Sequence, residues 1–361
     1  MIKTQTEYRP DHVSPPGETL LEILTDKGIS QADLATRMGR PVKTINEIVK
    51  GKAIIMPETA LQLEKVLGVE AAFWMSREQY YQEHMARLSE RDRFSHSLEW
   101  LKSFPIKQMT DYGWIKGVSS KPALLDEMLS FFGVASIEAW NETWENLKIA
   151  FRRSAKLQCN IASTRAWLRK GELDATEIQC APYDETAFTK VLGEIRNLTN
   201  HSPDVFIPQL REKCAATGVA TVFVHELPRT PICGATRWLN KNKALIQLSL
   251  RYKTNDHLWF TFFHEAGHIL LHGKKEVFIE TEDRLTDVLE EQADNFASKN
   301  LITDSDWNQF TISGLYTFRT VGSFANRVGI APGIVVGRLQ HENKIPFSFL
   351  NRLKQRLAWS D

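Results

Sequence analysis

The spacing of apolar residues predicts helices in the N-terminal and middle parts of the chain. Between positions 16 and 68, apolar residues recur every three or four positions and glycines interrupt them, which predicts four or five short helices. From about 80 to 171, helix formers and tryptophans are broken by prolines and glycines, which predicts further short helices. We therefore expect an α+β fold that is mostly α.

Three runs of β-branched and aromatic residues follow at 219–224, 234–239 and 244–250. Turn-forming residues separate them, so they predict a small antiparallel sheet. A long apolar run at 259–271 then predicts a buried helix. In the C-terminal region, Ala-x-x-x-Gly at 325–329 repeats a spacing found near the N-terminus and indicates a second helix pair, whose glycines favour packing over DNA reading.

The N-terminal pattern is that of a helix-turn-helix. Gly28 and Ser30 end one helix and begin the next, and Gly39 marks the turn before a helix at 42–49. Between positions 37 and 52 there are five basic residues and one acidic residue, a local charge of +4 that suits a DNA-binding edge. The residues expected to contact DNA are Arg40, Val42, Lys43, Asn46, Lys50 and Lys52. A helical module that binds protein is the alternative.

Several short segments carry a resemblance to a known family. Residues 28–35 and 44–52, followed by 57–60 and by Phe73-Trp74, resemble the XRE family and in particular its HigA-type antitoxins. The resemblance covers about residues 8–85. It implies a homodimer that binds operator DNA and represses its own promoter, and a toxin is the alternative partner.

The buried helix at 259–271 carries the sequence His-Glu-Ala-Gly-His at 264–268. Residues four apart share one face of a helix, so His264 and His268 can hold one ion. In such a motif Zn²⁺ lowers the pKa of its water toward ~7, and the intervening glutamate, here Glu265, accepts the proton. The alternative is a core helix whose two histidines are hydrogen-bonded within the protein.

A catalytic zinc needs a third protein ligand and one open position. The segment at 289–297 offers Glu290 and Asp294, four residues apart on a second helix with a small apolar side. We expect Glu290 to be the third ligand. Asp294 is then the outer carboxylate that fixes the tautomer of a ligand histidine.

The two motifs together resemble the ImmA/IrrE family of metallopeptidases over about residues 185–305. The resemblance implies a gluzincin-like zinc site, with His264, His268 and Glu290 as ligands and Glu265 as the general base. Members of this family lie near, or are fused to, helix-turn-helix regulators. The expected organisation, with its helical spacer and helical C-terminal region, is 1–80, 81–184, 185–305 and 306–361.

Composition narrows the function classes. Apolar residues make up 42% and charged residues 25% of the chain, as in soluble globular proteins. No stretch approaches the ~20 apolar residues of a membrane span, and the first residues lack the core of a secretion signal, so a cytoplasmic protein is expected. The four cysteines form no C-x-x-C pair. A net charge of +1 excludes a broadly basic surface, so DNA binding must come from the helix pair.

These patterns favour an antitoxin-like autorepressor that carries a zinc-dependent endopeptidase, which cleaves a regulator protein or the chain itself. The alternative is a non-proteolytic antitoxin or repressor whose zinc fold is a sensor or a toxin-docking surface. Zinc coordination separates the two, because three protein ligands and an open position favour the enzyme and a fourth side chain favours the sensor.

Overall fold

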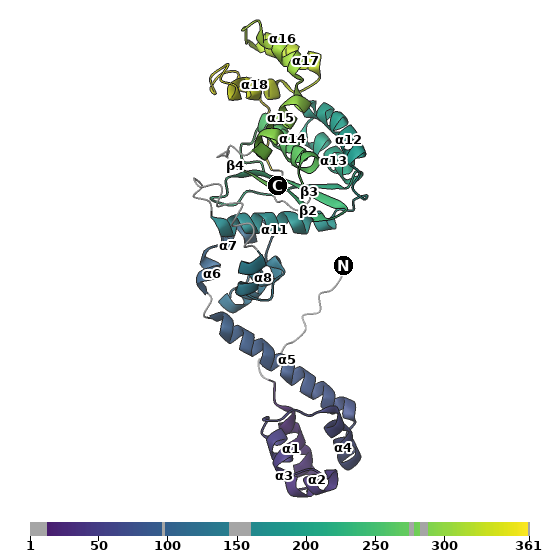
Figure 1. Ribbon diagram of the computed structural model, residues 1–361. Helices are drawn as coiled ribbons and strands as arrows, with labels where there is room; N and C mark the ends of the chain where they lie inside the picture. The colour runs from purple at the N-terminus through teal and green to yellow at the C-terminus, as the bar shows by residue number, and fades with distance from the viewer. Residues whose placement is uncertain (1–12, 96–97, 144–159, 274–277, 282–287, 360–361) are drawn as a thin grey trace. The chain divides into compact units, whose positions relative to one another are not determined.

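The computed structural model describes residues 13–95, 98–143, 160–273, 278–281 and 288–359 (Figure 1). The chain divides into two compact units, Met1–Leu98 and Glu99–Asp361. The helices of the first unit are α1 (Pro16–Asp26), α2 (Gln31–Met38), α3 (Val42–Val49), α4 (Pro57–Leu67) and α5 (Ala71–Ser95).

The first unit has the turns that its sequence predicts. The side chain of Ser30 caps α2 by accepting a hydrogen bond from the backbone of Asp33, and Gly39 ends α2 in the left-handed conformation that favours glycine. On α3, Ile45 and Ile48 are buried in the core, while Val42 is 48% exposed. This helix therefore has one face packed in the core and another face exposed.

Helices α1 and α3 approach one another at Gly17. A Cβ atom added at this glycine would lie 2.0 Å from the carbonyl oxygen of Ile48 and 2.7 Å from the Cα of Val49. Both neighbours are backbone atoms, which cannot move aside without shifting the helix. The absence of a side chain at position 17 therefore sets how closely these two helices pack.

The second unit begins with helices and continues into an α/β layer. Its first helices are α6 (Leu98–Lys102), α7 (Ile106–Asp111), α8 (Lys121–Phe132), α9 (Ile137–Thr143) and α11 (Ile161–Glu177). Next come α12 (Glu185–Asn197), η1 (Leu198–Asn200), α13 (Pro203–Ala215), β1 (Val219–Phe223), β2 (Ile232–Asn240), β3 (Lys243–Leu248) and α14 (Asn255–Leu271). The last are β4 (Phe278–Thr281), α15 (Val288–Leu301), α16 (Asp304–Thr311), α17 (Phe318–Val328), α18 (Pro332–His341) and η2 (Asn351–Leu353).

The strands form a mixed sheet in the order β1-β3-β2-β4. The expected mostly helical fold is confirmed, but the expectation of a wholly antiparallel sheet is wrong. β2 pairs antiparallel with β3 and β4, whereas β1 pairs parallel with β3. The reason lies in the connections. A tight turn joins β2 to β3, whereas the longer link from β1 to β2 lets β1 join the far side of β3.

The sheet lies between α11 and α14, which pack on its two faces (Figure 1). Alternate residues of β3 show this, because Ile246 belongs to the core cluster that contains Phe262 of α14. Its neighbour Gln247 is turned to α11 and donates a hydrogen bond to the carbonyl oxygen of Trp167 at 2.7 Å. The sheet thus gives α14 a rigid support along its length.

The C-terminal residues pack against the start of α14. The backbone N–H of Asn255 donates to the carbonyl oxygen of Gln355, whose own N–H donates to Asn255 Oδ1, both at 3.0 Å. Lys354 forms a buried ion pair with Asp256 at 2.6 Å. Helix α18 also packs closely on α14, and most of its residues are buried, which confirms that this helix serves packing. Across the described ranges, each helix is too short or too polar to cross a bilayer.

Candidate metal centre

Helix α14 brings its motif into the interior of the second unit. Its residues from Leu258 to Ile269 are almost all buried, because aromatic side chains pack on one side and α15 covers another. The contact with α15 is close at Gly267, where an added Cβ atom would lie 3.3 Å from the Cα of Ala293. Small residues on both helices therefore let the polar side chains around them reach one another.

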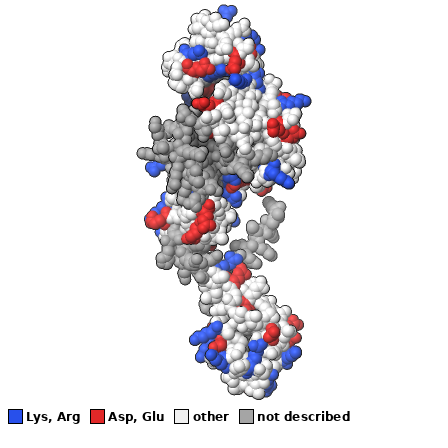
Figure 2. Space-filling view, viewed as in Figure 1, with Lys and Arg blue, Asp and Glu red and all other residues white. Residues whose placement is uncertain are grey.

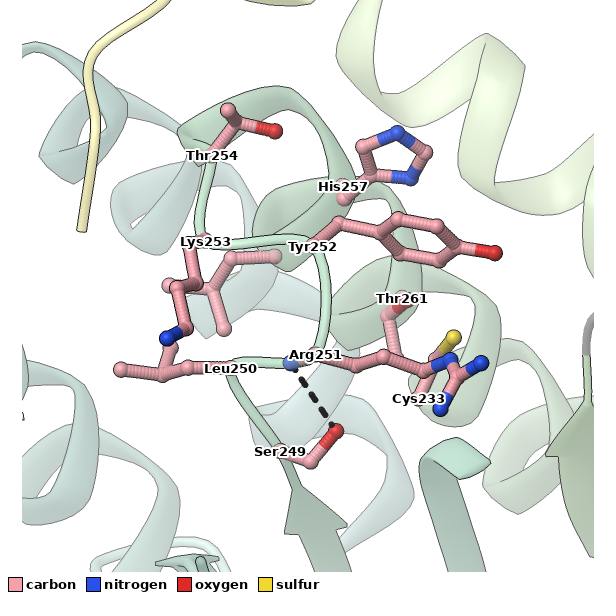
Figure 3. A pocket seen from close by; sticks show the side chains of 10 residues that line it. Cys233, Ser249, Leu250, Arg251, Tyr252, Lys253, Thr254, His257 and Thr261 are labelled. Carbon is pink, nitrogen blue, oxygen red and sulfur yellow. Dashed lines mark hydrogen bonds between the residues drawn. The ribbon is translucent and has the colours of Figure 1, made fainter. Parts of the chain in front are cut away.

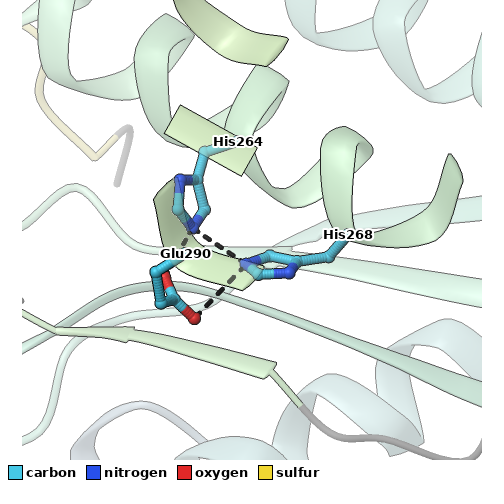
Figure 4. A group of neighbouring side chains, drawn as sticks. All are labelled: His264, His268 and Glu290. Atoms are coloured by element: carbon cyan, nitrogen blue, oxygen red, sulfur yellow. Dashed lines mark hydrogen bonds and ion pairs between the residues drawn. The ribbon is translucent and has the colours of Figure 1, made fainter. Parts of the chain in front are cut away.

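The three predicted ligand residues meet at one point (Figure 4). The Nε2 atoms of His264 and His268 lie 2.9 Å apart. The carboxylate of Glu290 approaches them with Oε2 at 3.1 Å from His264 Nε2 and Oε1 at 3.6 Å from His268 Nε2. Among the described residues, this group of potential metal ligands consists of these three side chains.

The spacing of these atoms fits a zinc ion. Four ligands at 2.0–2.1 Å from zinc in a tetrahedron lie ~3.3 Å from one another. The three observed distances between the ligand atoms, 2.9, 3.1 and 3.6 Å, lie around that value. The donor set of two imidazoles and one carboxylate, with a fourth position left over, is also the set found in catalytic zinc sites.

The charge states suit a metal ion as well. Burial lowers the pKa of His268 to about 4, so this imidazole is neutral at pH 7 and its lone pair is available. Burial acts to raise the pKa of Glu290, but its contacts with the imidazoles of His264 and His268 outweigh burial and hold that pKa well below its usual range. Glu290 is therefore a carboxylate throughout the physiological pH range.

Asp294 lies where the sequence predicts an outer carboxylate. Its Oδ1 atom is 2.9 Å from Nδ1 of His264. A carboxylate accepts the proton on Nδ1, which leaves the lone pair of His264 on Nε2, facing Glu290 and His268. With this tautomer, His264 has the lone pair that a metal ligand needs.

Glu265 is fully buried on the side of α14 that faces β2. The hydroxyl of Thr236 on β2 donates to its carbonyl oxygen at 3.1 Å. A Cβ atom added at Gly234 would lie 2.6 Å from Glu265 Oε1 and 2.5 Å from the methyl group of Thr261. Gly234 therefore makes the space for the Glu265 side chain. A glycine inside a strand often marks a close approach of another group, but the sequence does not show which residue approaches it.

The loop from β3 leads into the start of α14 beside a pocket that Cys233, Tyr252 and Thr261 help to line (Figure 3). The ring of Tyr252 stacks on the imidazole of His257 with centroids 4.1 Å apart. A cavity of about 440 Å³ extends from these two residues along Phe260 of α14 to Leu301 of α15 and Ile334 of α18. Phe260, one of the residues that line this cavity, lies one turn before His264 on α14.

The six residues expected to contact DNA lie in the first unit. Val42, Lys43, Lys50 and Lys52 are exposed. Two others already have partners, since Asn46 donates to Gln31 Oε1 at 3.3 Å and Arg40 donates to Gln62 Oε1. Sequence reasoning missed Gln31 and Gln62, which hold these side chains. Figure 2 shows Lys and Arg side chains among Asp and Glu on the visible face of this unit.

Comparisons with known proteins find a different family match in each of the two compact units. Residues 20–74 match the helix-turn-helix family, and residues 235–340 match the IrrE N-terminal-like domain of peptidase family M78. The chain thus combines a helix-turn-helix domain with an IrrE N-terminal-like domain. The IrrE N-terminal-like match includes all three residues of the ligand group, together with Glu265 and Asp294. The protein is a DNA-binding regulator that carries a peptidase-family domain.

Solved structures similar to the chain include two HigA proteins. An addiction module antidote protein of the HigA family from Coxiella burnetii is 27% identical, with a TM-score of 0.22. Antitoxin HigA from Pseudomonas aeruginosa, solved with the higBA promoter, is 29% identical, also with a TM-score of 0.22. Each similarity covers 24% of this chain and 94% of the other chain. No curated protein matches the chain.

Proposed function

We propose that the protein is an antitoxin-like autorepressor whose IrrE N-terminal-like domain is a zinc-dependent endopeptidase that cleaves a regulator protein or the chain itself. The observation that carries the peptidase proposal is the convergence of His264, His268 and Glu290, with the buried Glu265 on the same helix. A zinc ion bound there would polarise the scissile carbonyl and acidify a water molecule.

The residues of the chain supply the rest of the chemistry. Glu265 would accept a proton from the attacking water and give it to the departing amine. Strand β4 ends the described sheet next to β2, so its outer edge could pair with an extended peptide. The cavity that Phe260 helps to line would take an apolar side chain of that peptide, because Leu301 and Ile334 also line it.

The three-membered ligand group favours an enzyme over a sensor. A structural or sensing zinc is usually closed by four protein ligands, whereas a catalytic zinc keeps one position open. Within the part of the chain that is described, three side chains form the group. A buried glutamate one residue after the first histidine is also unnecessary for a purely structural site.

The purified full chain tests this function. We expect a single zinc ion per chain by elemental analysis, because the ligand atoms are already gathered. We also expect new peptide termini, detected by mass spectrometry, when the chain is incubated with regulators encoded beside its gene. A zinc chelator should prevent these cuts and added zinc should restore them. Absence of stoichiometric zinc, or cuts that persist in chelator, would contradict the proposal.

For the first unit we propose operator binding through α3 as a homodimer. Val42 and Lys43 are exposed at the start of this helix, where a major groove would meet them. Elsewhere on the unit, Ile54 and Met56 are 50% and 53% exposed beside an open groove. A second copy that covered this groove would remove these apolar side chains from water.

Two substitutions on α3 should affect DNA binding differently. Asn46→Ala should weaken the binding free energy by about 1–3 kcal/mol on the promoter of its own gene and change it little on unrelated DNA. The reason is that an amide side chain hydrogen-bonds to base edges. Lys43→Ala should weaken both complexes alike and reduce the salt slope by about 1, because an ammonium contacts phosphate. Gel-shift titrations over a range of salt concentrations measure both effects.

Lys65→Ala is the control for this experiment. Lys65 is exposed on α4, so its substitution makes the same change in charge away from α3. It should leave both complexes nearly unchanged. Equal effects of Lys43→Ala and Lys65→Ala would mean that α3 does not carry the contact.

A further inference from the structure

His272 and Gln292 form a hydrogen-bonded pair behind the second ligand histidine. His272 follows the last residue of α14, and its Nδ1 atom lies 2.8 Å from Nδ1 of His268. Its other ring nitrogen, Nε2, lies 3.1 Å from the side-chain oxygen of Gln292 on α15. Neither residue belongs to the group of ligand atoms. The chain of contacts therefore runs from α15 through His272 to the side of His268 that faces away from Glu290.

The chemistry of each group sets the position of every proton along this chain. An amide oxygen can only accept, so Nε2 of His272 carries the hydrogen that Gln292 receives. A neutral imidazole has a single N–H, so Nδ1 of His272 is then an acceptor. Nδ1 of His268 must therefore be the donor in the 2.8 Å contact. The lone pair of His268 is left on Nε2, which is the atom 2.9 Å from His264 Nε2.

We propose that Gln292 and His272 are positioning residues that fix the tautomer of His268 for zinc binding. Asp294 contacts His264 directly, whereas Gln292 reaches His268 through His272, by two contacts in series. The proposal rests on the metal centre put forward above. It assigns to the side chain of His272, and to an exposed glutamine of α15, a role that the ligand motif does not contain.

Variants of Gln292 separate this role from general effects on packing. Gln292→Leu has no acceptor, so the proton positions on His272 and His268 are no longer set. Its affinity for zinc should fall about 10–100-fold, as is usual when an outer partner of a ligand histidine is lost. Gln292→Glu keeps an acceptor oxygen and should retain the affinity within about threefold. Competition of the full chain against a chromophoric zinc chelator gives these dissociation constants.

A matched control and a double substitution complete the experiment. Asn295→Leu makes a similar change at an exposed position of α15 and should leave zinc affinity unchanged. His272→Ala should weaken zinc binding as Gln292→Leu does. Because the two residues act in series, the double variant should be no weaker than His272→Ala alone.

The possible outcomes distinguish the two proposals. If the wild-type chain does not bind zinc, the metal centre itself is wrong. If the wild-type chain binds zinc and Gln292→Leu binds it equally well, the metal centre stands and the positioning role is overturned. Additive losses in the double variant would also overturn it, because independent packing effects add whereas steps in series do not.

Discussion

Replacing Glu265 with Gln is expected to abolish cleavage while zinc stays bound. Glutamine has nearly the same shape, so it fits the space left by Gly234, but it cannot accept a proton from water. Loss of a general base typically lowers a rate about 10²–10⁴-fold. The ligand group does not include Glu265, so zinc content should remain unchanged. Product formation and elemental zinc are measured on the same preparation.

Glu291→Gln is the matched control for this experiment. Glu291 is exposed on α15 and adjoins Glu290 in the chain, so its substitution removes the same carboxylate near the site without touching the buried base. It should cleave at the wild-type rate. Full activity of Glu265→Gln would show that another group takes the proton, and loss of zinc from this variant would show that Glu265 supports the metal rather than the reaction.

Replacing Gly17 with Ala is expected to disrupt the helix-turn-helix unit and to abolish promoter binding. The added methyl group would lie 2.0 Å from the backbone oxygen of Ile48, so α1 and α3 must separate. Overpacking of this kind lowers the free energy of unfolding by up to about 3 kcal/mol. That is a large part of the stability of a small unit. Thermal unfolding and gel shifts measure the two effects.

The neighbouring substitution Glu18→Ala is the comparison for Gly17→Ala. Glu18 is exposed on the same helix, so its loss should change stability only slightly. Zinc binding should be the same in both variants, because Gly17 lies in the other compact unit. Wild-type melting of Gly17→Ala would mean that the two helices can move apart at little cost.

The features that could be predicted from the sequence are those fixed by local spacing. His264 and His268 are four residues apart on one helix, as are Glu290 and Asp294 on another, so each pair shares a face whatever the rest of the fold does. Small residues such as Gly267 then bring the two faces together. The first three strands were predicted for the same reason, since their composition is local.

The features that could not be predicted depend on contacts between distant residues. The parallel pairing of β1 with β3 depends on which edge of the β2–β3 hairpin it meets. The space at Gly234 is visible only once Glu265 is placed against it. The contact between His272 and Gln292 joins residues 20 positions apart and depends on their rotamers.

The attachment of residues 354–357 to the start of α14 also has a consequence for synthesis on the ribosome. Asn255 and its partner Gln355 are 100 positions apart in the chain. At a translation rate of ~5–20 residues per second, Gln355 is added about 5–20 s after Asn255. The helix-turn-helix is synthesised long before either. Each nascent molecule therefore acquires its helix-turn-helix first, and the start of α14 gains its contact with Gln355 only after 100 further residues have been added.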